Sequence, residues 1–282
     1  MTRLVVVIAV ACACKSGREL SEAEQMQSLP VATPVDGKRV TLPKATPRVG
    51  DVVVCEHGTD TRGLGELSGR TSRFTIRERT TREWTVLAVR ASDVTRVRVA
   101  YPDEQRSNEV NGRAVTEPIL LRGHAYVVDV HDDGTLAVDR AEAGGEGGAL
   151  SPEEAKRVRD DVAGELTDKD PNAALVGVEL VSGRVVPLAA EAVEAQVGGG
   201  AKVHRAEARL IDVRGATAVI EGHTEGEIAG SARPFEARAV STWDTATGRV
   251  LETTGVLVAH GPGEGGIAIT NRGKWIQTCH YR

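Results

Sequence analysis

The chain has 282 residues, of which 40% are hydrophobic and 27% are charged, a composition typical of folded proteins that excludes general disorder. This length allows one large domain or two smaller ones, each with a substantial core. The formal net charge of −5 and the aromatic content of 3% argue against nucleic acid as the main partner, because nucleic-acid binding requires basic surface and rings for base stacking.

The N-terminus has the pattern of a compact secretory signal. A single basic residue, Arg3, precedes the apolar run 4–11, and small residues follow this run. The run is too short to span a hydrocarbon core, which requires about 20 residues. We therefore expect a signal peptide over residues 1–11, and export of the protein.

The end of this signal resembles a known processing motif. The stretch Ala9-Val10-Ala11-Cys12 resembles the lipobox of bacterial lipoproteins, in which the Cys becomes the lipidated first residue, although Ala9 stands where Leu is usual. We favour Cys12 as the lipidated residue; the overlapping match at Cys14 is the alternative, and plain signal cleavage is a third. Because no Asp follows either Cys, the resemblance implies an outer-membrane lipoprotein that faces the periplasm or the cell surface.

Residues 12–48 are predicted to form a tether. This segment contains Pro30, Pro34, Pro43 and Pro47 among polar residues and has little periodicity. A flexible segment of this length reaches about 30 Å. We expect the folded region to begin at Val49-Gly50-Asp51.

Cys55 and Cys279 are the remaining cysteines of the mature chain. An oxidising compartment favours pairing them, and the first and last strands of an antiparallel sheet can be neighbours. We therefore predict a disulfide, with two unpaired buried thiols as the alternative. A metal site is not expected here, because no CxxC or second ligand cluster accompanies them.

Alternating polar and apolar residues predict strands in the first part of the folded region. A hairpin is expected around Asp132-Asp133-Gly134. The expected strands are 51–56, 71–79, 84–90, 94–101, 124–130 and 135–139.

The middle of the chain differs from its flanks. Ser151 and Glu154 form a capping box with Pro152 at the first helical position, and this predicts a helix over 152–166. A hairpin over 176–188 and a short helix over 189–197 are also expected.

The last part of the chain returns to strands, in an order similar to that of the first strand-rich region. The expected strands are 204–213, 217–223, 235–243, 249–259, 267–270 and 274–282. We therefore predict a mainly β fold, an antiparallel meander of open β-barrel-like sheets in two similar halves with a small helical insertion. The predicted organisation is a signal peptide (1–11), a lipid-anchored Pro-rich tether (12–48), an N-terminal β half (49–144), a helical insertion (145–200) and a C-terminal β half (201–282).

Two short motifs in this fold carry a further resemblance. The segment 242–250, with Asp244 and Thr247-Gly248, resembles the D-x-x-T-G hairpin of β-rich bacterial lipoproteins. The segment 42–51 is similar to the P-x-V-G-D opening of an uncharacterised lipoprotein family whose members carry two such halves. Related open-barrel lipoproteins shield lipid or other apolar ligands on the concave face of the sheet, and the resemblance implies this role.

No motif in the sequence indicates catalysis or a cofactor. The segment 261–266 fits GxGxxG, but a strand follows where a dinucleotide site needs a helix. The chain has no HExxH and no GxSxG motif. We expect no cofactor and no catalytic residue.

Two segments have part of the pattern of a weak cation site. Residues 129–134 approach a calcium loop, but Arg140 stands where the bidentate Glu should be. Glu221, His223, Glu225 and Glu227 share one face of a strand, although an exposed acidic edge that discourages aggregation explains the same pattern. No metal site is therefore predicted. A row of arginines could bind anionic headgroups, but is more typical of solvated sheet surface: Arg73, Arg77, Arg79, Arg96 and Arg98.

Small apolar residues alternate along one predicted sheet face, namely Ala206, Ala208, Ala237 and Ala239. They leave room for a ligand, or for close packing of a helix. We expect a non-enzymatic, lipid-anchored envelope protein with a ligand-binding or structural role, whose partners are the membrane and an apolar ligand or an envelope protein. The alternatives are an envelope hydrolase with a dispersed active site and an assembly lipoprotein that binds a partner without a ligand.

Overall fold

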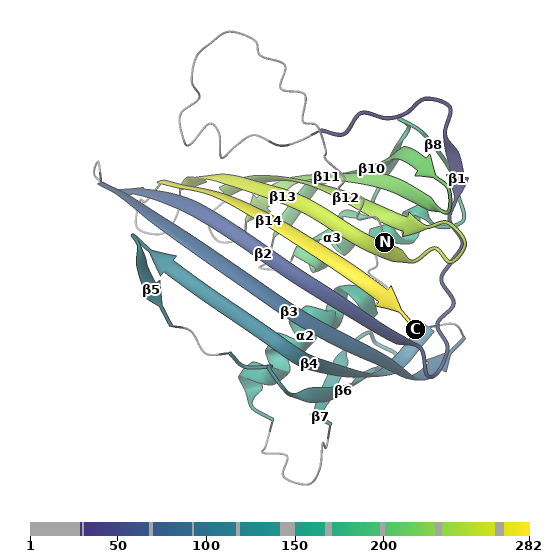
Figure 1. Ribbon diagram of the computed structural model, residues 1–282, viewed down its shortest axis with the longest axis horizontal. Helices are drawn as coiled ribbons and strands as arrows, with labels where there is room; N and C mark the ends of the chain where they lie inside the picture. The colour runs from purple at the N-terminus through teal and green to yellow at the C-terminus, as the bar shows by residue number, and fades with distance from the viewer. Residues whose placement is uncertain are drawn as a thin grey trace, which may run out of the picture.

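Antiparallel strands dominate the computed structural model of the chain (Figure 1). The structure describes residues 29, 31–67, 70–91, 93–116, 119–141, 150–166, 171–197, 201–228, 233–262 and 268–282. The predicted signal peptide (1–11) and both candidate lipidation residues, Cys12 and Cys14, lie outside these residues.

The strands follow one another in two runs, with the helical elements between them. In chain order the strands are β1 (Arg39–Thr41), β2 (Val52–Leu67), β3 (Arg70–Arg90), β4 (Asp93–Val110), β5 (Arg113–Val115), β6 (Ala125–Val130), β7 (Leu136–Arg140), β8 (Glu179–Val181), β9 (Val185–Pro187), β10 (Lys202–Arg214), β11 (Thr217–Ile228), β12 (Arg233–Asp244), β13 (Val250–Pro262) and β14 (Ala268–Tyr281). The helical elements are α2 (Pro152–Leu166), the 3₁₀ helix η1 (Pro171–Leu175) and α3 (Ala190–Val197). The predicted fold class, mainly antiparallel β with a small helical insertion, is confirmed.

The two strand-rich regions join into a single sheet. Over the described residues the sheet has twelve strands in the order β7-β6-β4-β3-β2-β14-β13-β12-β11-β10-β9, with β5 beside β4. Its centre is the pair formed by the first long strand, β2, and the last strand, β14, which run antiparallel from Val53 opposite Tyr281 to Glu66 opposite Ala268. The central seam of the sheet is therefore made by the two ends of the folded chain.

Several strands are longer than the sequence pattern predicted. The expected strands 71–79 and 84–90 are parts of the single strand β3, and the strands expected at 267–270 and 274–282 overlap with the single strand β14, Ala268–Tyr281. The polar residues around Thr80 and Arg82 interrupt the apolar pattern without interrupting the backbone, because these side chains face a cavity and the helix α2. Polar residues on an inward face thus caused the strand ends to be misplaced.

The hairpin expected over 176–188 is wrong. Its two strands do not pair with each other, because β8 pairs with β1 and β9 pairs with β10. The turn at Gly183 directs the chain from one neighbour to the other, and its N–H donates to the carbonyl of Leu210.

The described part of the predicted tether packs against the domain. The N–H of Ala32 donates to Glu221 Oε1 at 2.8 Å, and the N–H of Val35 donates to the carbonyl of Ile211 at 2.8 Å. Leu42, which follows β1, is fully buried. The ordered structure therefore begins well before Val49, because an apolar side chain and paired backbone groups hold this segment on the sheet.

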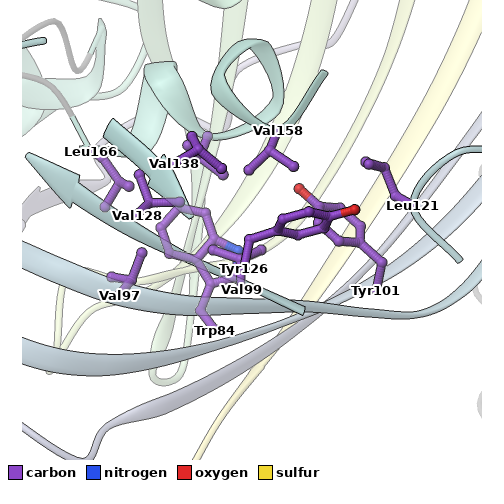
Figure 2. Close-up of a cluster of buried hydrophobic side chains, with 11 residues drawn as sticks. Trp84, Val97, Val99, Tyr101, Leu121, Tyr126, Val128, Val138, Val158 and Leu166 are labelled. Atoms are coloured by element: carbon purple, nitrogen blue, oxygen red, sulfur yellow. The ribbon is translucent and has the colours of Figure 1, made fainter. Parts of the chain in front are cut away.

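The helices cover one face of the sheet, which we call the inner face (Figure 1). Helix α2 places Val158 and Val162, both fully buried, against the strands β3, β4, β6 and β7. Figure 2 shows this cluster, in which the strand side chains face Val158 and Leu166. The 3.6-residue periodicity that predicted the helix thus also sets its buried face.

A second packed region lies under the other half of the sheet. There η1, β1 and β8 pack on β10–β12 around Leu42, Leu210 and Trp243, and α3 packs on β10–β13 around Val193 and Phe235. The hydrophobic core is therefore divided between the two halves of the sheet.

Glu154 connects α2 to two strands. The predicted capping box forms, since the N–H of Ser151 donates to Glu154 Oε2 at 3.0 Å and the N–H of Glu154 donates to Ser151 Oγ at 3.2 Å. The same carboxylate accepts the hydroxyl of Tyr126 at 3.1 Å and pairs with Arg140. Burial alone would raise the pKa of Glu154, but the hydrogen bonds from Ser151 and Tyr126 and the charge of Arg140 lower this pKa to about 2.

Replacing this carboxylate is expected to loosen the helix. Because the folded pKa lies below the ordinary value of 4.5, the stabilisation is complete above pH 4.5 and is lost as the pH falls towards 2. Glu154→Gln should lower the free energy of unfolding by about 2–3 kcal/mol at pH 7, measured by urea denaturation, with the difference shrinking towards pH 2. The exposed neighbour Glu153→Gln is the control and should cost at most about 0.5 kcal/mol; equal losses for the two variants would contradict the assignment.

The predicted disulfide is formed between β2 and β14. Cys55 and Cys279 lie directly opposite each other in the register, with a Cα–Cα distance of 4.2 Å. The bond joins residues 224 positions apart, and both side chains are buried. It therefore fastens the two ends of the folded chain at the centre of the sheet.

Removing the disulfide is expected to destabilise the whole sheet. The chain-entropy model gives about 5 kcal/mol for a loop of this length as an upper value. The double variant Cys55→Ala/Cys279→Ala should therefore unfold at markedly lower urea concentration than the oxidised protein, and close to the reduced protein. Peptide mapping of the unreduced, exported protein provides the second measurement: alkylation of both residues would show that the bond does not form.

Candidate functional site

The helices are too few to cover the inner face. Strands are spaced by about 4.8 Å, so the sheet is about 50 Å wide, whereas each helix with its side chains is about 10 Å across. Between the two packed regions lies a cavity of about 640 Å³, bordered by β2, β3 and β10–β14 on the sheet side and by α2, η1 and α3 on the other. The cavity therefore occupies the gap between the two parts of the divided core.

One side of the cavity, which we call the apolar wall, is built largely by the second half of the sheet. Its strands contribute small residues at alternate positions, so the backbone itself borders the space. Gly222 lies on β11 between two of these strands, and a Cβ built on it would meet nothing within 4 Å. The apolar wall consists of Leu175, Val193, Ala208, Ile220, Gly222, Ala237, Ala239 and Leu257. Three hydroxyl residues of the same strands also line the cavity, namely Thr224, Ser241 and Thr253, and Thr253 Oγ1 donates to Ser241 Oγ at 3.1 Å.

The opposite side, which we call the polar wall, is built by the central strands. It consists of His57, Thr59 and Thr61 of β2, Thr80 of β3 and Asn271 of β14. Among the described residues, none of these five side chains has a hydrogen-bond partner, and Asn271 Oδ1 is buried without one. These groups are therefore available to a bound molecule or to water.

A compensated charge cluster closes the cavity at the α2 end. Arg82 donates to Asp161 at 3.0 Å, and its guanidinium lies 4.6 Å from the ring centroid of Trp84. Asp161 also accepts the hydroxyl of Tyr101 at 2.7 Å, and burial raises the pKa of this tyrosine. The charge of Arg82 is thus neutralised within the protein.

His57 lies beside this cluster and keeps accessible surface in the cavity. Burial is the largest influence on its pKa and lowers it from 6.5; the charge of Asp161 opposes this shift and that of Arg82 adds to it. The neutral imidazole, which can both donate and accept a hydrogen bond, is therefore favoured at neutral pH.

Glycines opposite aromatic rings shape the inner face. Gly255 of β13 lies directly across from Trp275 of β14, and a Cβ on this glycine would lie 2.1 Å from the indole. The same arrangement joins Gly226 to Phe235. The rings lie over the glycine backbone and leave the space above it open.

Two glycine substitutions should distinguish a glycine that is packed against a ring from a glycine that borders open space. Gly255→Ala would displace the Trp275 ring and should lower the free energy of unfolding by about 1–3 kcal/mol. Gly222→Ala enters the cavity without contact and should be neutral, or stabilising by up to about 1 kcal/mol, because the unfolded chain loses freedom. Urea denaturation of both variants measures the difference; equal destabilisation would show that the cavity is not open at Gly222.

The acidic strand face considered as a metal site lies on the other, outer face of the sheet. There Glu221 pairs with Arg209 at 2.6 Å, and His223 Nε2 lies 2.9 Å from Glu236 Oε1. In the part of the chain that the structure describes, no group of three or more His, Cys, Asp or Glu side chains has the arrangement of a metal site. The arrangement is a network of ion pairs.

The calcium-like turn and two residues of the arginine row, Arg77 and Arg96, also take part in ion pairs. Asp132 pairs with Arg90, and Asp129 lies 3.4 Å from Arg96. Arg77 lies 3.5 Å from Asp60 on the neighbouring strand. These contacts are typical of solvated sheet surface.

Histidines and hydroxyl groups meet in two places, without completing a catalytic triad among the described residues. His260 Nδ1 of β13 lies 2.6 Å from Thr270 Oγ1 of β14, and among the described residues no hydrogen bond or ion pair links these two side chains to a carboxylate. In the cavity, Asp161 already accepts hydrogen bonds from Arg82 and Tyr101 and makes none to His57.

The sequence pattern located only the apolar wall. Ala208, Ala237 and Ala239 were identified by their alternation, and all three line the cavity; Ala206 instead packs under α3. The polar wall was missed because the first strand was expected to end at Glu56. The alternation of His57, Thr59 and Thr61 was the available signal.

Comparison with known proteins gives only distant likenesses. No family model and no curated protein matches the chain. A lipovitellin structure, described as showing lipid–protein interactions, aligns with 82% of the chain at 8% identity and a TM-score of 0.48; the chain spans about a quarter (26%) of that protein. The translocator domain of the autotransporter NalP from Neisseria meningitidis aligns over 82% of this chain and 89% of that one, at 9% identity and a TM-score of 0.20.

Among the described helices, none is both long and apolar enough to cross a membrane.

Proposed function

We propose that the protein is an exported, lipid-anchored protein of the cell envelope that binds an apolar ligand, without catalysis, in the cavity on its inner sheet face. The observation that carries this proposal is the apolar wall, where Ala208, Gly222 and Ala237 leave a cavity of about 640 Å³ beside a packed core. Ligand sites commonly have volumes of about 300–1,000 Å³. The volume is therefore suited to a small amphiphile or a lipid chain.

The energetics of the space favour an occupant. Apolar surface that stays in contact with water costs about 25 cal/mol per Å² relative to burial, so the apolar wall is less favourable when it is hydrated than when a ligand covers it. Water can occupy the polar wall, but it finds too few hydrogen-bond partners at the apolar wall. An apolar ligand removes this surface from water.

The anchoring part of the proposal rests on the N-terminal sequence. The apolar run 4–11, followed by Cys12, supports export and lipidation, with the outer membrane as the expected location because no Asp follows the Cys. The disulfide between Cys55 and Cys279 agrees with an oxidising compartment.

Native mass spectrometry of the exported, detergent-free protein tests ligand binding. We expect an added mass that persists in the native spectrum, is lost on denaturation and belongs to an apolar molecule. Gly222→Ile projects a branched side chain into the cavity and should reduce the bound fraction at least tenfold. Thr254→Ile is the matched control, because it places the same side chain on the exposed outer face of β13 and should retain the ligand.

Two outcomes would contradict ligand binding in this cavity. A bare mass for the wild-type protein, together with no uptake of added lipid, would contradict ligand binding and favour a structural or assembly role. Equal retention of ligand by Gly222→Ile and Thr254→Ile would place the ligand outside this cavity.

A further inference from the structure

The cavity has two chemically different ends. The polar wall lies on β2, β3 and β14, and the apolar wall lies mainly on β10–β13. From β2 to β11 there are four strand spacings, which is about 19 Å. A molecule that spans the cavity therefore meets unpaired hydrogen-bonding groups at one end and mainly aliphatic carbon at the other, where the hydroxyls of Ser241 and Thr253 are hydrogen-bonded to each other.

The polar end offers several unused hydrogen-bonding groups. Thr59, Thr61 and Thr80 each carry a hydroxyl that can donate or accept, and Asn271 carries a buried oxygen that accepts from no described group. Leaving a buried polar group unsatisfied is unfavourable. These groups therefore favour a ligand head that hydrogen-bonds several times.

The polar end also lacks an uncompensated charge among the described residues that line it. Arg82 is paired with Asp161, and Asp160 is paired with Lys156. Lys274 borders the cavity but is exposed, and it alternates with the inward residues Gly273 and Trp275. An ionic head group would lose hydration on entering and gain no counter-charge.

We infer that the ligand is an uncharged amphiphile, with a hydroxyl- or amide-bearing head on the polar wall and a hydrocarbon chain along the apolar wall. This inference rests on the proposed function, because it assumes that the cavity is the binding site. It assigns to Thr59, Thr61, Thr80 and Asn271 the recognition of the head group. The lowered pKa of His57 agrees with a neutral site, since Asp161, Arg82, Glu78 and Arg157 are the charges that act on it.

A set of probes that share one chain length tests the head-group preference. The full mature protein is titrated, below micelle-forming concentrations, with 1-monolauroylglycerol, laurate and dodecyltrimethylammonium, and binding is measured by native mass spectrometry at pH 7.5. We expect the uncharged monolauroylglycerol to bind at least tenfold more tightly than either ion. Equal affinities, or tighter binding of an ion, would overturn the inference while leaving the proposed function intact.

Isosteric variants test the assigned residues. Thr59→Val/Thr61→Val keeps the shape and the β-branching but removes both hydroxyls, so it should weaken monolauroylglycerol at least fivefold and change laurate less than twofold. Thr254→Val on the outer face is the control and should change neither. If the double variant does not fold, as judged by circular dichroism, Thr80→Val replaces it with the same expectation; unchanged affinity in a folded variant would overturn the assignment of the polar wall.

Failure of the proposed function gives a different result. Binding of none of the three probes, with no co-purified mass, would remove the ligand site itself and the inference with it. A co-purified molecule that carries a net charge would instead confirm ligand binding and overturn the inference alone.

Discussion

The pairing of β2 with β14 is the constraint on which the rest of the structure depends. It joins residues near the beginning of the ordered chain to its last strand over fourteen residue pairs, from Val53–Tyr281 to Glu66–Ala268. Contacts between such distant residues carry a large loop-closure entropy. The Cys55–Cys279 bond removes part of this cost by restricting the unfolded chain. Without this seam, the two strand-rich regions would be separate sheets with exposed central edges.

The divided core follows from this seam. A continuous sheet of this width exceeds what one fifteen-residue helix and one eight-residue helix can cover. The helices arise from the middle of the chain, and each packs against a different half of the sheet. The central strands therefore receive no helix, and their inward positions carry Thr59, Thr61 and Asn271 in place of large aliphatic residues. The cavity thus results from the placement of the helices on separate halves of the sheet, and the small and polar inward side chains of the central strands leave it open.

Local patterns in the sequence were sufficient for much of this fold. The Ser151–Glu154 capping box, the alternation of Ala237 and Ala239 and the two isolated cysteines each predicted a feature that the structure contains. The length of β3 could not be read in this way, because its polar residues Thr80 and Arg82 reflect contacts with a distant helix. The position of β8 beside β1 depends on long-range pairing, on which local periodicity carries no information. Sequence reasoning thus found the elements and the apolar wall, whereas the polar wall required the tertiary arrangement.

Consecutive residues of β11 contact the tether on one face of the sheet and the cavity on the other. The carboxylate of Glu221, which faces outward, accepts a hydrogen bond from the N–H of Ala32. Arg209 donates to the carbonyl of Ala32 at 3.0 Å. Gly222, the next residue, faces the cavity on the other side of the sheet. Because successive side chains of a strand point to opposite faces, the part of the predicted tether around Ala32 is held against the outer face, and Leu42 further along packs in the second region of the core. The outer face carries only a smaller pocket of about 230 Å³ among the described residues, lined by Val31 of the tether and by Arg209, Glu221 and His223. A chain anchored through its N-terminus would therefore be held from the side opposite the larger cavity, none of whose lining residues belongs to the described tether.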